Sequence, residues 1–491
     1  MNIFKRINNV GKSINKIFDR RKGIIVAGLF FIFMFYFTFK NNTFWIYNDA
    51  KAYYAFSGFF IRDGHFAFSN YDNDLRGYIW PLMLLPIKIV AEWLGRNPAT
   101  VFRLIFALFS AGFFAVLVPN GVERIFKVKA NFLQRLIYIC LVLFFWAPTL
   151  LQPLSDMPSF MFNLMGIYLI YYASTEKKVW LKYLFVFIAG MLFAATSLFR
   201  PVYQFSLYIA VILIIILNLK KGSRKNIILL VPLIIGAAVM FTPQMIINMK
   251  NFGFLSPYAQ AQSSLDGRLL NQMGLGIVST GSTGYIGEEI IPIRTINMFD
   301  LKLVNIEVRG PRQWFIPNAH GLQLLEKLGG VHFESYGEYA DYVLKYPFDF
   351  IAVWMTHLFY GLDLQFPWIY NFSVKPTGVL YSLLNYTVLF FVTKSLIVKG
   401  WFKNGGFAKT ISLIILLIPC MVALMVNMEE RFMLPLHMVI YMFFAFNPNI
   451  REIFSKKIKF NFGMTLVYIL FVAFCFTLSA SLMSGIGLIL H

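Results

Sequence analysis

The chain has few charges and few cysteines. Only 14% of its 491 residues are charged, 58% are hydrophobic, and the mean hydropathy is +0.65. Soluble domains carry about a quarter charged residues, so this composition excludes a soluble globular protein. The three cysteines, Cys140, Cys420 and Cys475, all lie in apolar runs. This placement predicts buried thiols and gives no support to a disulfide, to thiol catalysis or to a cysteine-bound metal.

Acidic residues are scarce as well, yet the resulting net charge of +21 does not indicate nucleic-acid binding. Seven Lys and Arg lie within residues 1–22, directly before the uncharged run 23–39. This pattern predicts an uncleaved membrane anchor with a cytoplasmic N-terminus. The Gly-rich stretch 274–289 has neither GxGxxG nor P-loop spacing, and His320 and His332 have no HxxH or Cys partner. A nucleotide site and a histidine metal site are therefore not indicated.

Long apolar runs are what the sequence does contain. A helix needs about 20 apolar residues to cross the hydrocarbon of a bilayer, with about 17 as a lower limit. Eleven uncharged runs reach or approach this length and predict an all-α polytopic membrane protein with 11–13 transmembrane helices. The runs are 23–39, 104–119, 136–155, 157–175, 183–199, 201–219, 226–249, 376–393, 410–428, 432–450 and 460–490.

The distribution of Lys and Arg sets the predicted orientation, because basic loops favour the cytoplasm. With eleven crossings, the cytoplasmic segments hold 26 basic and four acidic residues, and the rest of the chain holds 18 and 19. Two shorter apolar segments, 79–94 and 350–362, are therefore predicted to lie in the interface or to re-enter from outside. The cytoplasmic segments are 1–22, 119–135, 175–182, 219–225, 394–409 and 448–460.

The same topology divides the chain into four parts. Residues 1–22 form a basic cytoplasmic N-terminus, and 23–249 form a transmembrane core with an external loop at 40–103. Residues 250–375 form a large external loop with an interfacial or re-entrant helix, and 376–491 supply the C-terminal transmembrane helices. Within the large loop, the first half, rich in Gly, Ser and Thr, predicts a mobile lid, and the second half predicts helices.

Asp49 lies near the start of the first external loop, in the sequence IYNDAKAYYAF. It fits the N-cap of a short helix, which contributes about 1 kcal/mol. It also fits a general base that this helix holds just above the membrane, and the two roles are compatible. Three basic residues that follow, Arg76, Lys88 and Arg103, fit either membrane anchors or a basic collar around a lipid phosphate.

Isolated charges mark two further junctions between apolar runs. Asp156 is the only charge within 39 residues of apolar sequence, and Arg200 repeats the pattern in SLFRPVY. Asp156 fits a cap for the helix that begins at Met157 and Pro158. A charge at such a place is costly unless it caps, pairs or takes part in function.

The sequence NMEERFMLPLH supplies the remaining charges at the predicted external ends of the helices, among them Glu430 and Arg431. Together with Asp49, Asp156 and Arg200, they predict an acid-and-arginine cleft at one membrane surface. Arginine in such a cleft suits phosphate, because its planar fork binds two phosphate oxygens at once.

Residues 20–250 and the later ERFMLP stretch resemble the GT-C superfamily of membrane glycosyltransferases. The likeness is to bacterial relatives of the dolichyl-phosphate-mannose protein mannosyltransferases and lipid A aminoarabinose transferases, which are similar to glycosyltransferase family 39. The shared pattern is one crossing, a long external loop with an early Asp, interfacial helices, and short helices with an external Asp. By this resemblance, Asp49 in NDAKAYY is the catalytic acidic residue and Asp156 in SDMP is the second acidic position. Arg200 in FRP takes the place of a basic residue near the donor phosphate.

The resemblance implies an inverting transferase at the periplasmic face of the bacterial inner (plasma) membrane, with membrane lipids around it. It would move a sugar from a polyprenyl-phosphate donor to a lipid, glycan or protein acceptor, with Asp49 as the base. A divalent metal ion bound by Asp49 and Asp156 is compatible with this scheme. The residues expected to bind substrate are Asp156, Arg200, Arg431, Glu430, Arg103 and Lys88.

Two other classes of membrane protein remain as alternatives. A lipid-glycan transporter or flippase would carry charges at helix centres and related halves, whereas these charges lie at helix ends and the sequence has no convincing internal repeat. A surface-polysaccharide polymerase or ligase also has many crossings and a large external loop. The early Asp in the loop after the first crossing favours the GT-C pattern over this class, in which the large loop tends to come late.

Overall fold

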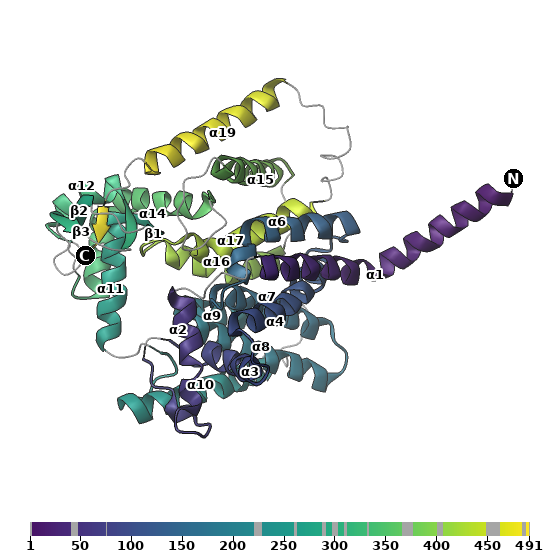
Figure 1. The fold of residues 1–491 in the computed structure, drawn as a ribbon, viewed down its shortest axis with the longest axis horizontal. Helices are drawn as coiled ribbons and strands as arrows, with labels where there is room; N and C mark the ends of the chain where they lie inside the picture. Colours follow the sequence, from purple (N-terminus) through teal and green to yellow (C-terminus); the bar gives the residue numbers. More distant parts are fainter. Residues whose placement is uncertain are drawn as a thin grey trace.

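The computed structural model describes residues 2–40, 48–74, 76–219, 228–259, 263–286, 291–296, 303–308, 312–330, 333–365, 377–399, 406–447, 462–483 and 488–490. Helices dominate these residues, and the few strands lie at one end of the molecule (Figure 1). The first helices are α1 (Asn2–Lys40), α2 (Asn48–Phe56), η1 (Phe59–Ile61), η2 (Phe68–Asn70), α3 (Ile79–Trp93), α4 (Pro98–Gly112), the π-helical turn η3 (Phe113–Leu117), α5 (Val118–Phe126), α6 (Phe132–Leu150), α7 (Asp156–Thr175), α8 (Val179–Phe199), η4 (Pro201–Tyr203), α9 (Gln204–Leu219) and α10 (Leu230–Phe252).

The second half of the chain contains the sheet and the remaining helices. Its helices are α11 (Ser263–Val278), α12 (Ala319–Leu328), α13 (Tyr336–Lys345), α14 (Pro347–Leu362), α15 (Thr377–Lys399), α16 (Gly406–Ala423), η6 (Glu430–Met433), α17 (Leu434–Phe446) and α19 (Phe462–Met483). Its strands are β1 (Ser279–Ile286), β2 (Ile291–Ile296), β3 (Leu303–Val308), β4 (Arg312–Pro317) and β5 (Leu488–Leu490).

Eight helical stretches in the described residues are long and apolar enough to cross a membrane. The chain is thus a helical membrane protein, as its composition predicts. Each of the eleven predicted runs carries a helix, but α7, α9 and α17 are outside the eight, so the number of crossings stays a prediction. The eight stretches are Arg21–Lys40, Pro98–Phe126, Phe132–Leu150, Val179–Phe199, Leu230–Phe252, Gly378–Leu396, Gly406–Ala423 and Phe462–Leu482.

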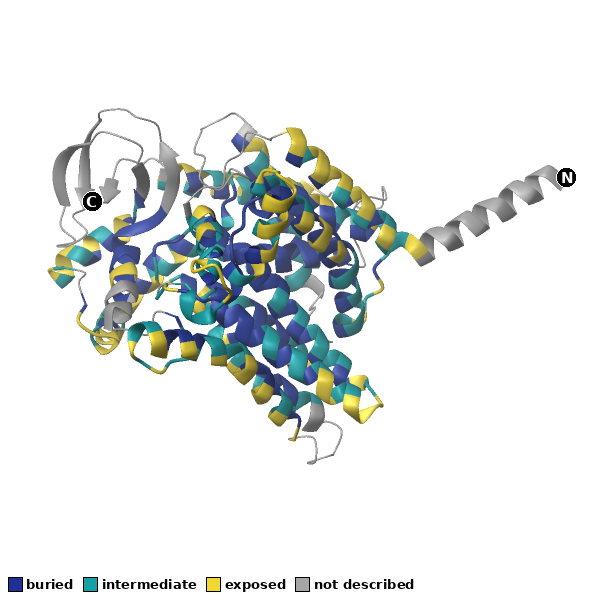
Figure 2. Cartoon of the chain, turned by 60° about the horizontal axis from the view of Figure 1, so that its bottom comes forward, coloured by how far each residue is buried: buried dark blue, intermediate teal, exposed yellow. Residues whose placement is uncertain are grey.

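Large apolar side chains stay exposed on the outer helices. Ile24 of α1 is 71% exposed, Ile234 of α10 is 63% exposed, and Phe474 of α19 is 61% exposed. Figure 2 shows buried residues through the middle of the helical body and exposed residues along the outer helices. So extensive an apolar surface is unfavourable in water but matches a lipid solvent.

The cysteines follow the same division between core and outer surface. Cys420 and Cys475 are buried, as the sequence predicts. The prediction for Cys140 is wrong, because its side chain is exposed on α6. A thiol behaves as a small apolar group, so an apolar run does not distinguish a core position from an outer position that faces lipid.

The two short apolar segments of the sequence both form helices. They are α3, with 15 residues, and α14, with 16 residues. At about 1.5 Å per residue, such helices reach roughly 24 Å, whereas the hydrocarbon core of a bilayer is about 30 Å thick. Trp93 at the end of α3 is 82% exposed, and Phe348 at the start of α14 is 85% exposed. These helices are therefore shorter than an upright crossing needs, as are α9 and α17 of the predicted crossings, and the interfacial position of α3 and α14 stays a prediction.

Four strands within residues 250–375 and the strand β5 further along the chain form a five-stranded sheet, which the sequence pattern does not predict. The strand order is β1-β4-β5-β2-β3, so the C-terminal strand β5 lies in the middle, antiparallel to β4 and parallel to β2. Within the stretch 274–289, predicted as a mobile lid, the described residues 274–286 form the end of α11 and strand β1, and the mobility of this stretch stays a prediction. The helices predicted for the second half of the loop are confirmed as α12 and α13, and Tyr339 of α13 packs against Phe350 of α14.

Glycines allow α8 and α10 to approach closely. A Cβ on Gly190 of α8 would collide with the backbone of Leu233, and a Cβ on Gly236 of α10 would collide with the backbone of Phe187. Small residues at helix interfaces are the usual means of close packing in membranes. Helix α8 also packs along α7, so α7, α8 and α10 form one layered group. This group carries two of the residues of the candidate site.

Candidate active site

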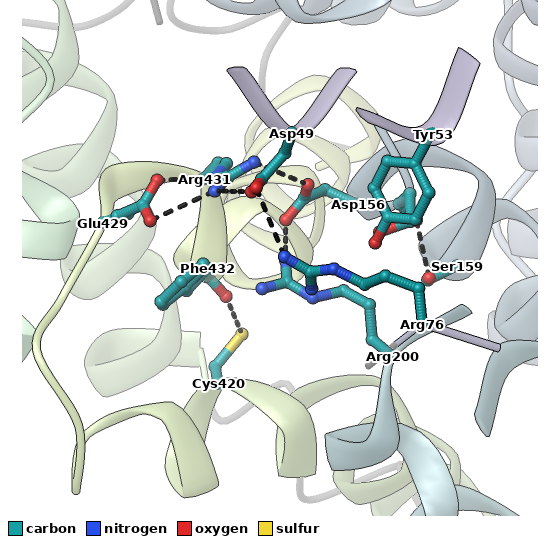
Figure 3. Close-up of polar contacts among 11 residues, drawn as sticks. Asp49, Tyr53, Arg76, Asp156, Ser159, Arg200, Cys420, Glu429, Arg431 and Phe432 are labelled. Atoms are coloured by element: carbon teal, nitrogen blue, oxygen red, sulfur yellow. Dashed lines mark hydrogen bonds and ion pairs between the residues drawn. The ribbon is translucent and has the colours of Figure 1, made fainter. Parts of the chain in front are cut away.

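A network of ion pairs joins residues that lie far apart in the sequence (Figure 3). Asp49 comes from the first turn of α2, and Arg76 comes from the loop before α3. Asp156 is the first residue of α7, and Arg200 follows the last residue of α8. Arg431 comes from η6. Four of the residues predicted from sequence, Asp49, Asp156, Arg200 and Arg431, are thus brought together.

Arg431 is the centre of this network. Its Nη2 lies 2.7 Å from Oδ2 of Asp49, and its Nη1 lies 3.7 Å from Oδ2 of Asp156. Glu429 binds the same guanidinium through two nitrogens, with 2.7 Å from Nε to Oε2 and 3.1 Å from Nη2 to Oε1. The Arg431 side chain is only 7% exposed. A planar guanidinium offers five donors in a fixed fork, so one arginine can bridge three carboxylates from different elements.

The other two arginines each bind one of the central acids. Nη2 of Arg76 lies 3.2 Å from Oδ1 of Asp49. Arg200 forms an ion pair with Asp156, whose side chain is 3% exposed. The positive end of the α7 dipole adds to the stabilisation of the Asp156 carboxylate, because Asp156 lies in the first turn. Capping of α7 therefore does not account for Asp156, which also pairs with two arginines.

Aromatic rings lie beside two of the arginines, Arg76 and Arg200. Tyr53 lies one turn after Asp49 on α2, and its hydroxyl is 3.0 Å from Oγ of Ser155, next to Asp156. The Arg76 guanidinium lies 5.4 Å from the centre of the Tyr53 ring, and that of Arg200 lies 4.5 Å from the Phe432 ring. Such cation–π contacts contribute about 0.5–2 kcal/mol each. They hold the charged groups near one another without neutralising them.

The network balances three carboxylates against three guanidinium groups. Burial alone would raise the pKa of the Asp49 carboxyl, but Arg431 and Arg76 outweigh burial and lower this pKa from 3.8 to about 2. Because the pKa is lower in the folded protein, the ionised carboxylate makes its full contribution to stability at pH values above the ordinary pKa of an aspartate. This contribution is lost only as the pH falls towards 2.

Three predicted substrate-binding residues make other contacts. Burial and the neighbouring Asp363 raise the pKa of Glu430 well above its usual value, so this carboxyl faces another acid. Nζ of Lys88 lies 5.8 Å from the centre of the Tyr54 ring on α2. Arg103 is 1% exposed and donates from Nε to the carbonyl oxygen of Leu151 at the end of α6. Lys88 and Arg103 thus support α2 and α6, and their binding of phosphate stays a prediction.

Glu429 and Arg76 belong to the network although the sequence does not single them out as site residues. In the sequence, Glu429 is only one of three adjacent charges, and Arg76 fits a membrane anchor somewhat better than the collar. The spacing of Glu429 two residues before Arg431 is the one signal that favours a local pair. For Arg76 the sequence carries no such signal, because its partner Asp49 lies 27 residues away.

A divalent metal bound by Asp49 and Asp156 does not fit this arrangement. Arg431 lies between these two carboxylates and contacts both of them. Both oxygens of Asp49 accept hydrogen bonds from arginines. Among the described residues, no group of three or more His, Cys, Asp or Glu side chains is arranged to hold a metal ion. A dication would have to displace a buried guanidinium, so we assign no step to a metal at this position.

Gly77 sets the position of Arg76 and gives a first prediction. A Cβ at Gly77 would collide with the carbonyl oxygen of Leu198, two residues before Arg200. We expect Gly77→Ala to destabilise the protein by about 1–3 kcal/mol, the usual cost of overpacking. The measurement is thermal unfolding in detergent. Gly112→Ala is the control, since a Cβ there meets nothing within 4 Å. Equal stability of the two variants would contradict the close packing.

Comparisons with known proteins give no relative. No family model, no curated protein and no solved structure matches this chain. The function of the site therefore has to be argued from its own chemistry.

Proposed function

We propose that this protein is a GT-C-type membrane glycosyltransferase that moves a sugar from a polyprenyl-phosphate donor to a hydroxyl acceptor. The observation that carries the proposal is the bridging of Asp49 and Asp156 by Arg431, with Arg76 and Arg200 alongside. A phosphate needs arginine forks, and an acceptor hydroxyl needs a carboxylate base. This network supplies both within a helical membrane protein.

In the proposed reaction, the oxygen of the acceptor hydroxyl attacks the anomeric carbon of the donor sugar. Asp49 accepts the proton of that hydroxyl. The bond between that carbon and the phosphate oxygen breaks, and the lipid phosphate leaves with the electron pair. The new glycosidic bond forms on the opposite face, which inverts the configuration. Arg200 and Arg431 stabilise the negative charge on the departing phosphate, as preorganised donors do in other transfer reactions. Asp156 and Glu429 keep Arg431 in place.

A membrane enzyme suits such a donor, because the polyprenyl chain remains in lipid while the phosphate reaches the surface. We place the site at the periplasmic face of the bacterial inner membrane, with eleven crossings and a cytoplasmic N-terminus, as the distribution of basic residues favours. On this topology, residues 250–375 lie on the same side as the site. Their sheet and the helices α11 to α13 are then the region available to a lipid, glycan or protein acceptor.

The test of this proposal is a donor-class assay with the full-length protein in liposomes. Sugars linked to polyprenyl phosphate are compared with the same sugars linked to polyprenyl diphosphate, and release of the free lipid phosphate is followed by mass spectrometry. We expect sugar transfer and release of polyprenyl phosphate only from the monophosphate donors. Exclusive use of diphosphate donors would favour the polymerase or ligase class. Movement of the intact lipid-linked sugar across the bilayer without cleavage would favour a flippase.

A further inference from the structure

The structure holds Asp49 in a state that does not suit a base. Both oxygens of the carboxylate are engaged, Oδ1 by Arg76 and Oδ2 by Arg431 (Figure 3). These arginines lower its pKa from 3.8 to about 2. Because one pKa unit is about a tenfold change in proton affinity, the carboxylate is a much weaker base than a free one. At least one of the two arginines has to move away from the Asp49 carboxylate before the carboxylate can accept a proton.

The two arginines differ in their freedom to move. Arg431 is bound by Glu429 and Asp156 as well as by Asp49, and its side chain is only 7% exposed. The side chain of Arg76 is 29% exposed, and within the described part of the chain Asp49 is its ion-pair partner. Its backbone is held separately, because the Arg76 amide donates to Asn73 and its carbonyl accepts from Tyr71. The guanidinium of Arg76 can therefore turn while its loop stays in place.

A donor phosphate would compete directly with Asp49 for Arg76. The network is balanced, with three carboxylates and three guanidinium groups, so an added phosphate leaves an excess of negative charge. Arginine binds phosphate through paired, charge-assisted hydrogen bonds, whereas only one nitrogen of Arg76 reaches Asp49. The exchange thus offers Arg76 a better partner and leaves Oδ1 of Asp49 facing the site.

We propose that Arg76 is the donor-responsive residue of the site, which covers Oδ1 of Asp49 in the free protein and moves onto the donor phosphate when the donor binds. Oδ1 is then open to the acceptor hydroxyl, so the base is released only when a donor is present. This order protects the donor from premature attack by water. The inference rests on the proposed function and adds to it a role for Arg76 in uncovering Oδ1 of Asp49.

The experiment measures the protonation of Asp49 by infrared difference spectroscopy in phosphatidylcholine liposomes. The Asp49 carboxyl band is identified by its loss in Asp49→Asn, and its titration is followed with polyprenyl phosphate, with polyprenol, and with neither. We expect polyprenyl phosphate to raise the titration midpoint by at least about one pH unit, a tenfold change in proton affinity. Polyprenol should leave the midpoint unchanged.

Variants of two arginines separate Arg76 from general effects of charge. In Arg76→Gln the midpoint should already be raised without lipid, and polyprenyl phosphate should bind roughly tenfold more weakly because a charged fork is lost. Arg62→Gln is the matched control, since Arg62 lies in the same loop over the Phe59 ring, at 4.4 Å from its centre. It should behave as the unmodified protein. If Arg76→Gln does not fold, Arg76→Lys replaces it and should show the weaker binding.

Two negative outcomes have distinct meanings. If polyprenyl phosphate binds the unmodified protein and the Asp49 midpoint does not move, the role of Arg76 is wrong and the proposed function stands. If polyprenyl phosphate does not bind at all, the proposed function fails, and the inference fails with it. Binding itself is measured separately, by native mass spectrometry of the same protein.

Discussion

Replacing Asp49 with Asn should abolish sugar transfer and leave the protein folded. The amide has nearly the shape of the carboxylate, but it does not accept a proton, and a positioned general base contributes about 10²–10⁴-fold to a rate. The ion pairs of Asp49 are lost in this variant, but its side chain is 33% exposed and Arg431 keeps Asp156 and Glu429 as partners, so the protein should remain folded. We therefore expect a loss of at least about a hundredfold in transfer rate, measured with polyprenyl-phosphate donors in liposomes.

Asp349→Asn is the matched control for this experiment. Asp349 is also a partly exposed carboxylate with a cationic partner, since it lies 2.9 Å from Nζ of Lys327, but it belongs to α14 and not to the network. Its replacement should leave transfer unchanged. Full activity of Asp49→Asn at normal expression would remove Asp49 from the proposed mechanism.

Replacing Arg431 with Gln should have the largest effect on stability. Three carboxylates, those of Asp49, Asp156 and Glu429, would lose a cationic partner at once. Removing one member of a buried ion pair costs about 3–5 kcal/mol. Here the cost falls mainly on Glu429, because Asp49 keeps Arg76 and Asp156 keeps Arg200 as partners. We expect a large fall in the thermal unfolding temperature, together with the loss of transfer.

A double variant tests whether the cost comes from orphaned charge. Glu429→Gln removes one of the carboxylates that Arg431 neutralises, so the pair Glu429→Gln with Arg431→Gln should be more stable than Arg431→Gln alone. A double-mutant cycle measures this coupling, and residues in one ion-pair network usually couple by about 0.5–3 kcal/mol. Strict additivity of the two changes would show that Arg431 does not neutralise Glu429 and would contradict the network.

Much of the helical framework could be predicted from the sequence, because each apolar run is long enough to specify a helix on its own. Asp156 and Arg200 were also predictable as a site, since a lone charge between apolar runs must find a partner. The predicted topology places both at one membrane surface, but their direct pairing depends on how closely α7 and α8 pack, which a single sequence does not state.

The remaining site depends on contacts over long distances in the sequence. Arg76, Lys88 and Arg103 are three basic residues near the same apolar segments, and nothing local separates them. The structure places Arg76 on Asp49, Lys88 on Tyr54 and Arg103 on the end of α6. Arg76 reaches Asp49 because the backbone at Gly77 packs directly against Leu198 of α8, and this packing cannot be read from the sequence.

The sheet escaped prediction for a related reason. Strand β5 pairs with β2 and β4, although Leu488 lies well over a hundred residues from either strand. In the sequence, these last residues simply extend the apolar run 460–490. The Gly- and Ser-rich pattern of β1 predicts a loop, and only pairing with β4 makes it a strand. Strand pairs of this kind are determined by their partners more than by their own composition.

The position of Asp156 and Arg200 at the same end of the α7–α8 pair has a consequence for biogenesis. An Asp or Arg in the middle of an inserting segment costs about 2.5–3.5 kcal/mol during translocon-mediated insertion. Asp156 begins α7 and Arg200 follows the end of α8, so both charges remain at one end of a two-helix hairpin. They can neutralise each other as soon as α8 emerges from the ribosome and integrates. Arg431 of η6 is synthesised much later. The complete network can therefore form only after η6 has packed against α2 and α7.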